Sequence, residues 1–399
     1  MGTPVQGSPS FPLPLTAFNE CLSGTVQMNS RFQVQYRLAC PLSEAADVAN
    51  QIAFEQSVCH QPHLVAPGFL KNEIAGRIEE LTALDEHHSQ VSISFLSETV
   101  GNEITQLMNV LYGNISLTKG IRVTDLQLSS DLKAHFTGPR FGITEIRERL
   151  GIPTGALMMA DIGPLGRSTN ELAELTYRFA EGGVDLIIDE HLITDQSWSP
   201  FRERVHACCK AVERANAKTG RKSCYVPNIT SSMEEMMLRA DWAARYGAGG
   251  LLVCPGLTGF ESLRRLSQSR RPGLPIIVQP AFLGSFILSP NQGISVGLLF
   301  GTIFRMAGAD CVMFPIPSER FSFEAADCKD VIDRCYAQDP FWKKTLPVVG
   351  GSIGENQLPQ LKKEYGDDVI YLVGRQLYGM SADLPENVRQ LRRILERET

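Results

Sequence analysis

The fold is decided by residues 156–189, which read ALMMADIGPLGRSTNELAELTYRFAEGGVDLIID. This stretch opens with a short apolar strand, Ala156–Asp161, and closes with a second one, Val184–Asp189. Between them, Thr169–Glu181 has the spacing of a helix with one apolar and one charged face. Two apolar strands joined by such a helix are typical of a parallel βαβ unit. The stretch therefore predicts a parallel sheet covered by helices.

Strand and helix keep alternating from this unit to the C-terminus. Further helices are predicted at Pro200–Ala215, Met233–Tyr246 and Ser295–Ala307. No GxGxxG follows the first strand, which argues against an open dinucleotide-binding sheet and favours a (β/α)8 barrel, the TIM-barrel fold. The predicted barrel strands are Ala156–Asp161, Val184–Asp189, Ser223–Asn228, Gly250–Cys254, Pro275–Gln279, Asp310–Phe314, Leu346–Val349 and Val369–Val373.

The N-terminal third of the chain has a different pattern. Phe32–Leu38 (FQVQYRL) alternates as a strand does, Ser43–Phe54 has the spacing of a helix capped by serine, and Val91–Phe95 is another alternating strand. We expect a small α+β, ferredoxin-like domain here. The predicted division is a flexible leader at 1–24, the α+β domain at 25–137 and the barrel domain at 138–399.

Composition and charge exclude several classes of protein. The 399 residues carry a formal net charge of −6 and no basic run, so the phosphate-neutralising surface of a nucleic-acid-binding protein is missing. No apolar stretch approaches the ~18 residues of a membrane span, and the N-terminus lacks the pattern of a signal peptide. The ten cysteines form no CxxC pair, which fits reduced thiols in the cytosol. We expect a cytoplasmic protein with a small-molecule substrate and no nucleic-acid or membrane partner.

Function in a TIM barrel collects at the C-terminal ends of the strands, where the βα loops surround an open mouth. Of seven histidines only His191 falls at a predicted strand end, so it is the best candidate for proton transfer or metal ligation. A loop histidine bonded to a neighbour is the alternative. The candidate residues at the mouth are Asp161, Asp189, Glu190, His191, Asn228, Gln279, Ser318, Arg320, Gly350, Gly351, Gly374 and Arg375.

These candidates suggest two kinds of ligand. Asp189, Glu190 and His191 offer carboxylates and an imidazole, which suit Mg²⁺, Mn²⁺ or Zn²⁺, although consecutive strand residues cannot all face one way. The alternative is a solvated acidic loop that caps a helix. Gly350-Gly351 and Gly374-Arg375 follow the last two strands, where many barrels bind phosphate through backbone N–H groups. Turns without a ligand need glycine as well.

A series of short motifs runs in order along the chain. They are FEQSV at 54–58, YGN at 112–114, GPRFG at 138–142, LG at 165–166, GGVD at 182–185, DQSWSPFRERV at 195–205, YVPNIT at 225–230, CPGLTG at 254–259, QPAFLG at 279–284, GADCVMFP at 308–315 and VVGGS at 348–352. Together they resemble the large-chain family of ribulose bisphosphate carboxylase (RuBisCO), and most closely its non-fixing RuBisCO-like branch, form IV. The likeness runs from about Phe32 to the C-terminus.

The resemblance implies a homodimer in which the N-terminal domain of one subunit completes the barrel mouth of the other. By that mapping Glu55 and Asn114 would enter the partner's site and contact the substrate. It also implies a Mg²⁺ site, which the carboxylating enzymes build on a carbamylated lysine at the end of the second barrel strand. Here the matching run is Ile188 to His191.

The departures from the carboxylating enzymes decide the chemistry. Ile188 has no amine, so no carbamylated lysine can form and carboxylation is excluded. Any divalent cation, Mg²⁺ or Mn²⁺, would then be held weakly by Asp189, Glu190 and His191. Other replacements fall at the first, fifth and sixth barrel strands and in the mobile loop, namely Ile162-Gly163-Pro164, Gln279-Pro280, Met313-Phe314 and, near the loop lysine, Arg320.

The leading hypothesis is an enzyme, an isomerase or lyase that forms an enediolate from a phosphorylated ketose or sugar-acid derivative. His191 would be the base or acid, Glu190 and Arg320 would assist, and Asn228 and Gln279 would contact substrate oxygens. One alternative is a catalytically inactive paralogue that acts as a small-molecule sensor or assembly subunit. Another is a metal-free hydrolase or decarboxylase that binds a carboxylate through arginines.

The shape of the barrel mouth separates these hypotheses. An open, polar mouth shared by His191, Gln279, Arg320 and Arg375 favours an enzyme. A mouth filled by aromatic and thioether side chains favours the sensor or assembly subunit; the candidates for filling it are Phe282, Met313 and Phe314.

Overall fold

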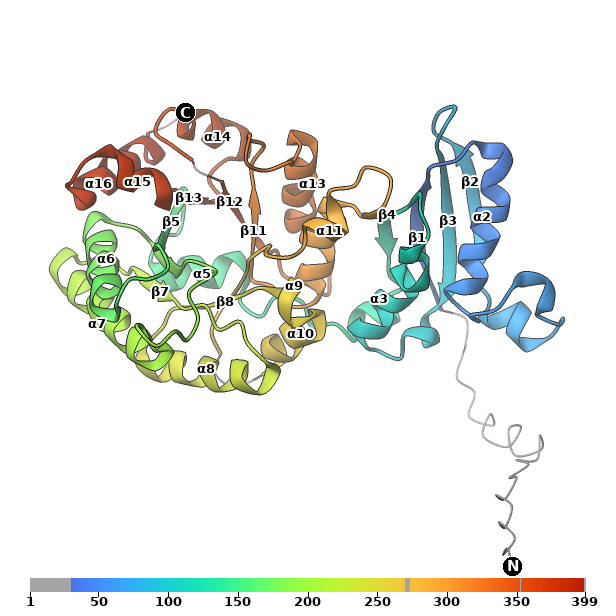
Figure 1. The fold of residues 1–399 in the computed structure, drawn as a ribbon, viewed down its shortest axis with the longest axis horizontal. Helices are drawn as coiled ribbons and strands as arrows, with labels where there is room; N and C mark the ends of the chain where they lie inside the picture. Colours follow the sequence, from blue (N-terminus) through green and yellow to red (C-terminus); the bar gives the residue numbers. More distant parts are fainter. Residues whose placement is uncertain (1–29, 270–272, 352, 398–399) are drawn as a thin grey trace, which may run out of the picture.

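The computed structural model describes residues 30–269, 273–351 and 353–397 of the chain; the predicted leader, residues 1–24, lies outside them. A barrel surrounded by helices and a smaller sheet with its own helices lie next to each other (Figure 1). This arrangement confirms the predicted fold class, while the division at residues 137 and 138 stays a prediction. Within the described residues, no helix has the length and apolar character needed to cross a membrane.

The smaller sheet is built around β1 (Arg31–Leu38), which pairs antiparallel with β3 (Ser89–Leu96) and β4 (Ile121–Gln127), while β2 (Arg77–Ala83) forms the edge beyond β3. Every second residue of β1 is buried because successive strand side chains face opposite sides of the sheet. These buried residues share one core with the apolar faces of α2 (Leu42–Glu55) and α3 (Ile104–Tyr112).

One strand of this sheet comes from the barrel part of the chain. The two-residue strand β10 (Gly293–Ile294) pairs parallel with β4 beside Arg122 and Val123. The Arg122 guanidinium donates hydrogen bonds to backbone carbonyls in the segment just before β10. The sequence did not predict that a barrel segment adds a strand to the N-terminal sheet, because two residues are too few to show an alternating pattern.

The barrel contains eight parallel strands in the order β7-β6-β5-β13-β12-β11-β9-β8. It closes where the backbone after β7 bonds to β8, at the bridge between Asn228 and Leu252. Each predicted strand overlaps one of those observed, which are β5 (Leu157–Ile162), β6 (Leu186–Asp189), β7 (Cys224–Val226), β8 (Leu251–Val253), β9 (Ile276–Val278), β11 (Cys311–Pro315), β12 (Leu346–Gly350) and β13 (Ile370–Leu372).

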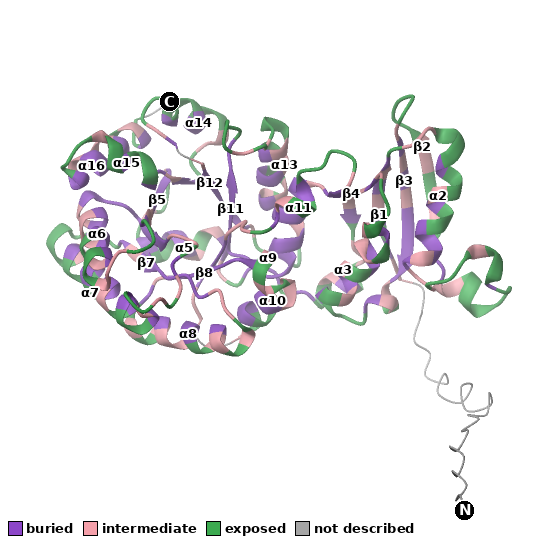
Figure 2. Cartoon of the chain, viewed as in Figure 1, coloured by how far each residue is buried: buried purple, intermediate pink, exposed green. Residues whose placement is uncertain are grey.

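Helices between the strands form the outer layer of the barrel (Figure 2). The first of them, α6 (Thr169–Gly182), begins with a capping box in which Ser168 and Glu171 bond each other's backbone N–H groups. The described helices around the barrel are α6, α7 (Phe201–Thr219), α8 (Met233–Tyr246), α9 (Pro255–Thr258), α10 (Phe260–Gln268), α11 (Gly284–Ile287), η5 (Leu298–Ile303) with α12 (Phe304–Met306), α13 (Ala325–Tyr336), α14 (Leu358–Tyr365), α15 (Gly374–Met380) and α16 (Leu384–Leu395).

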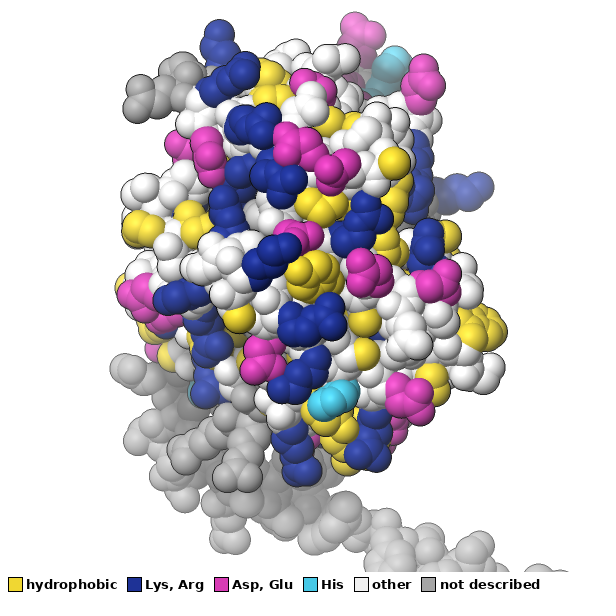
Figure 3. All heavy atoms as spheres, turned by 90° about the vertical axis from the view of Figure 1, so that its left-hand side faces the viewer, with side chains coloured by type: hydrophobic (Ala, Val, Ile, Leu, Met, Phe, Trp, Pro, Cys, Tyr) yellow, Lys and Arg dark blue, Asp and Glu magenta, His cyan; other side chains and the backbone are white. Residues whose placement is uncertain are grey.

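The outer face that carries α6, α7 and α16 mixes basic and acidic side chains (Figure 3). Glu386 pairs with Arg389 and Arg393, and Glu181 pairs with Lys218. Exposed pairs of this kind contribute little to stability, so the barrel depends on its interior instead.

The two ends of the barrel differ. At the end where the strands begin, Ile146 and Leu150 of α5 (Gly142–Leu150) pack in one apolar cluster with Leu157, Leu186 and Cys311. This helix closes the N-terminal end with hydrocarbon. At the other end the strands are followed by polar residues of the βα loops, where TIM barrels place their functional sites.

Candidate active site at the barrel mouth

A cavity of about 290 Å³ lies at the C-terminal ends of the barrel strands. Its size fits a small-molecule ligand. His191, Gln279, Arg320 and Arg375 all line it, as the enzyme hypothesis requires. Altogether the lining includes the predicted residues Asp161, Asp189, Glu190, His191, Gln279, Arg320, Gly350, Gly351, Gly374 and Arg375.

Glu190 and His191, just after β6, form a hydrogen-bonded pair. Nδ1 of His191 lies 2.6 Å from Oε1 of Glu190, whose Oε2 accepts the N–H of Leu192 at 3.0 Å. Burial opposes ionisation of Glu190, but the bond and charge of His191, the Leu192 N–H and the charge of Arg375 outweigh it and hold the pKa of Glu190 below its ordinary value. The carboxylate thus fixes Nδ1 of the imidazole and leaves Nε2 to exchange a proton with a ligand.

Asp161, at the end of β5, is the second carboxyl of the cavity. Burial raises its pKa, against the effect of its own backbone N–H and of Arg375. The site therefore holds two carboxyl groups whose pKa values are displaced in opposite directions, which is how many enzymes separate an acid from a base.

Gly374 begins α15 directly against Asp161. A Cβ atom at this position would lie 2.0 Å from Oδ1 and 2.8 Å from the backbone nitrogen of Asp161. A glycine is therefore required here for close packing, whether or not the turn also binds an anion. Gly351 has a φ of +111°, a backbone conformation that residues with a Cβ atom rarely adopt, so glycine is favoured here by conformation and not by close packing.

Replacing Gly374 with alanine is expected to lower the free energy of unfolding by about 1–3 kcal/mol, because the added methyl group must push Asp161 away. Gly379→Ala in the same helix is the matched control, since nothing lies within 4 Å of its added Cβ and alanine favours helix. Urea unfolding followed by circular dichroism measures both variants. Equal stability of the two would contradict the packing described here.

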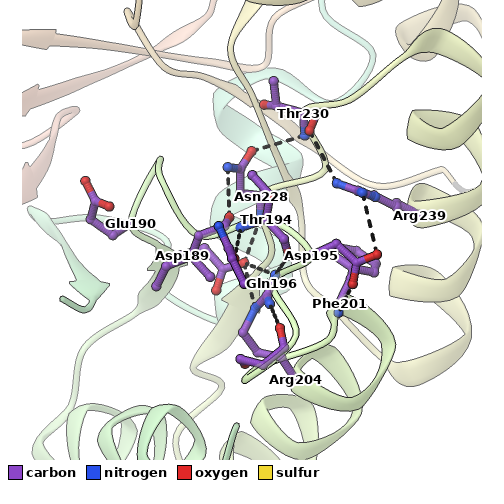
Figure 4. Close-up of polar contacts among 12 residues, drawn as sticks. Asp189, Glu190, Thr194, Asp195, Gln196, Phe201, Arg204, Asn228, Thr230 and Arg239 are labelled. Carbon is purple, nitrogen blue, oxygen red and sulfur yellow. Dashed lines mark hydrogen bonds and ion pairs between the residues drawn. The ribbon is translucent and has the colours of Figure 1, made fainter. Parts of the chain in front are cut away.

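Asp189 lines the cavity, but its carboxylate is taken up by hydrogen bonds within the barrel wall and is not free to hold a metal ion as predicted. Its side chain is fully buried, and its two oxygens accept hydrogen bonds from Tyr225 Oη at 2.6 Å, the Asn228 N–H at 3.0 Å and Arg204 Nε at 3.3 Å. Figure 4 shows Glu190 pointing away from this group. The physical reason is the alternation of strand side chains, which places Asp189 and Glu190 on opposite sides.

Asn228 is also buried and fully bonded, so it cannot contact substrate oxygens as predicted. Its Nδ2 donates to the carbonyls of His191 and Ile193 at 2.9 and 3.1 Å, and its Oδ1 accepts the N–H of Thr230 at 3.1 Å. Sequence reasoning missed Arg204 and Tyr225, which complete this group. The signal that could have found Arg204 is its place as a charged residue on the apolar face of α7, among Phe201, Val205 and Cys208.

Three further predicted residues lie outside the cavity lining. Ser318 is exposed in a turn where its Oγ accepts the N–H of Phe321 at 3.2 Å. Glu55 and Asn114 are joined by a hydrogen bond of 2.8 Å at the surface of the N-terminal unit. The roles of the latter two in a partner's site stay predictions.

The donor set does not fit a divalent cation. Glu190 and His191 bond to each other, Asp189 is saturated, and Ile188 offers only hydrocarbon. Within residues 30–269, 273–351 and 353–397, no group of three acidic, histidine or cysteine side chains could hold a metal. Mg²⁺ is usually held by one or two carboxylates, with waters completing its octahedron, and both carboxylates at the end of β6 are engaged in bonds to protein groups.

Bicarbonate is therefore expected to leave the affinity for Mg²⁺ unchanged, because Ile188 has no amine to carbamylate. Any residual affinity should favour Mn²⁺ over Mg²⁺, since the imidazole of His191 is the softer ligand. Calorimetric titration of both ions, with and without bicarbonate, measures this directly. A tight site for Mg²⁺ that depends on bicarbonate would show that the assignment at the end of β6 is wrong.

The rest of the cavity wall is apolar. Ile188, Leu252, Met313, Phe314 and Leu372 line it together with the charged residues. Met313 and Phe314 are buried side chains of β11 that leave the cavity open. Phe282 lies outside the lining, and its side chain is 69% exposed. The mouth is thus not filled as the sensor hypothesis requires.

A parallel barrel with carboxyl, imidazole and guanidinium groups at its C-terminal mouth is the arrangement typical of TIM-barrel enzymes. Residues 142–316 match the family described as "Ribulose bisphosphate carboxylase large chain, catalytic domain". A 5-methylthioribulose-1-phosphate isomerase from Rhodospirillum rubrum is 30% identical over 88% of this chain and 92% of its own. A 2,3-diketo-5-methylthiopentyl-1-phosphate enolase from Bacillus licheniformis is 31% identical over 92% of each chain.

A solved structure is equally similar. The Rubisco-like protein from Rhodopseudomonas palustris superimposes with a TM-score of 0.83 and 30% identity, covering 93% of this chain and 100% of that one. The chain belongs to the ribulose bisphosphate carboxylase large-chain family, in its RuBisCO-like branch. The resemblance seen in the sequence motifs is thereby confirmed.

Proposed function

We propose that this protein is an enzyme that moves a proton on the carbon next to a carbonyl group, as an enolase or isomerase of a phosphorylated ketose or sugar-acid derivative. The observation that carries the proposal is the hydrogen-bonded pair of Glu190 and His191 in one cavity with Asp161, whose pKa is displaced the other way. The two enzymes to which the chain is similar are named for sugar-phosphate isomerisation and enolisation.

Each residue has a role in this reaction. His191 takes the proton through Nε2, and Glu190 stabilises the resulting imidazolium. The electron pair of the broken C–H bond forms the carbon–carbon double bond, and the carbonyl oxygen receives the charge. Asp161, kept protonated to a higher pH by burial, donates its proton to that oxygen. No step requires a metal, in keeping with the donor set.

The mixed lining of the cavity, with charged and apolar residues, fits a substrate with one anionic and one apolar end. Arg375 and Arg320 are exposed cations at the rim that can bind a phosphate or carboxylate in a bidentate manner. Gly350 and Gly351 line the same side of the mouth and could add backbone contacts. Gln279 can add a donor, because its Oε1 already accepts from the Ala281 N–H at 2.7 Å. The apolar wall would take an alkyl or methylthio group, which the names of both relatives contain.

The proposed assembly is a cytoplasmic homodimer that completes this mouth. Exposed apolar side chains stand on loops and short helices after the barrel strands, with Leu257 57%, Phe282 69% and Phe286 40% exposed. A second copy that covers them with its N-terminal unit would bring Glu55 and Asn114 to the cavity. Light scattering should give twice the mass of one chain, and a monomer at micromolar concentration would contradict the assembly.

Two compounds test the reaction. We expect either 5-methylthioribulose 1-phosphate or 2,3-diketo-5-methylthiopentyl 1-phosphate to be converted, as followed by ³¹P NMR, with equal rates in EDTA. A compound that raises the melting temperature without being converted would instead favour a small-molecule sensor. If neither compound is bound or converted, the proposed substrate class is wrong.

A further inference from the structure

The polar group beneath the cavity consists of Asp189, Arg204, Tyr225 and Asn228, here called the Asp189 network. All four side chains are buried, with exposed fractions of 0–1%. Arg204 forms an ion pair with Asp189 at 3.3 Å, and Asp189 also accepts from Tyr225 and Asn228. Burial alone would lower the pKa of Arg204, but the Asp189 carboxylate and Tyr225 raise it above its ordinary value. The guanidinium is thus permanently charged.

The remaining donors of the network all reach one loop, residues 190–199, which follows β6 and carries the catalytic pair. Arg204 donates to the carbonyls of Thr194 and Ser199 at 2.5 and 2.8 Å. Asn228 donates to the carbonyls of His191 and Ile193 at 2.9 and 3.1 Å. These bonds converge on the loop from two different elements, α7 and the turn after β7, as Figure 4 shows.

Apolar burial contributes little to the order of this loop. Between residues 190 and 198 only Ile193 is buried, while Leu192 and Trp198 are 55% and 49% exposed. The network therefore supplies four hydrogen bonds to the loop backbone at and after His191, and it fixes Asp189 just before the loop. A loop held mostly by polar contacts opens locally when those contacts are removed.

We propose that Arg204 and Asn228 are positioning residues that hold the 190–199 loop so that Glu190 and His191 meet each other and face the cavity. Neither touches the ligand; they act through the backbone carbonyls of the loop. The inference rests on the proposed function only for the role given to the catalytic pair. It assigns to the buried asparagine a purpose different from the substrate contact that the sequence suggested.

The test compares Asn228→Ala and Arg204→Lys with a matched control, Asn216→Ala. Asn216 bridges the backbone N–H and carbonyl of Ser223 at 3.0 and 2.9 Å, at the opposite end of the barrel from the cavity. The first measurement is amide hydrogen exchange of the peptide that contains residues 190–199. We expect exchange in this peptide to be at least ~10-fold faster in the two network variants and unchanged in the control.

The second measurement is the titration of Glu190 by NMR of its carboxyl carbon, assigned by loss of the signal in Glu190→Gln. The groups that face Glu190 are His191, Arg375 of α15, Asp161 of β5 and Cys254 at the end of β8, and none is altered. Release of the loop removes the bonds from His191 and Leu192, so the midpoint should rise by about half a pH unit or more. A purely structural role would lower stability without moving this midpoint.

Unchanged exchange and an unchanged Glu190 midpoint in both network variants would overturn the inference, and so would equal changes in Asn216→Ala. If Asn228→Ala does not fold, Arg204→Lys decides by the same two measurements, because it keeps the charge opposite Asp189. Neither measurement uses a substrate. The positioning role and the proposed reaction can therefore fail independently of each other.

Discussion

Replacing His191 by glutamine is expected to lower kcat about 10²–10⁴-fold, the usual contribution of a positioned general base. Glutamine keeps a polar side chain of similar length but cannot take up a proton. Because the His191 side chain is 34% exposed, stability should hardly change. The KM for the phosphorylated substrate should stay within a few-fold, since the arginines that bind the anion remain. Steady-state kinetics and a thermal melt measure both effects.

The control for this variant is His206→Gln. His206 is exposed on α7, packs edge-on against Tyr246 with ring centroids 5.1 Å apart, and does not line the cavity. It should keep full activity. A His191 variant that retains its kcat would remove the base from the proposed mechanism. Glu190 has a lowered pKa, so its carboxylate should stay ionised below pH ~4.3, the ordinary value for a glutamate, as NMR of its carboxyl carbon measures in the folded protein.

Replacing Arg204 by methionine is expected to destabilise the fold by about 3–5 kcal/mol, because it leaves Asp189 as an uncompensated charge inside the barrel wall. The side chains of both partners are 0% exposed, so water cannot replace the lost bonds. Urea unfolding should show a large fall in the transition midpoint. Lys210→Met, which breaks an exposed pair with Glu213, is the matched control and should not move the midpoint measurably.

A double variant tests whether the unpaired charge is the cause. Adding Asp189→Asn to Arg204→Met removes the charge while keeping an acceptor for Tyr225. The double variant should be more stable than the sum of the two single changes predicts. Strict additivity would mean that the loss arises from the packing of the arginine stem instead.

The barrel could be predicted from the sequence because each strand is a short apolar run followed by a helix with its own periodic face. Met233–Tyr246, for example, was predicted with the bounds that α8 has in the structure. The pairing of β10 with the N-terminal sheet could not be predicted, since it depends on hydrogen bonds between segments about 170 positions apart, such as that from the Arg122 guanidinium to the Gln292 carbonyl.

The candidate site was predicted in position but not in every role. Strand ends identified Asp161, Glu190, His191 and Arg375, because parallel strands all end on the same side of the barrel. The bonding of Asp189 could not be predicted, because its partner Arg204 lies on a helix whose depth beside the strands is set only by packing. The bonding of Asn228 could not be predicted either, because its partners are backbone carbonyls of the 190–199 loop. A sequence pattern names polar residues at a strand end; it does not say which of them face inward.

The central claim is proton transfer next to a carbonyl group by His191, and deuterium exchange tests it most directly. The protein is incubated in D₂O with 5-methylthioribulose 1-phosphate or 2,3-diketo-5-methylthiopentyl 1-phosphate, and the protons beside the carbonyl are followed by ¹H NMR. The account predicts loss of one such proton signal with the native enzyme, also in EDTA, and none with His191→Gln. Exchange that persists in His191→Gln, or no exchange of either compound by the native protein while it binds them, would contradict it.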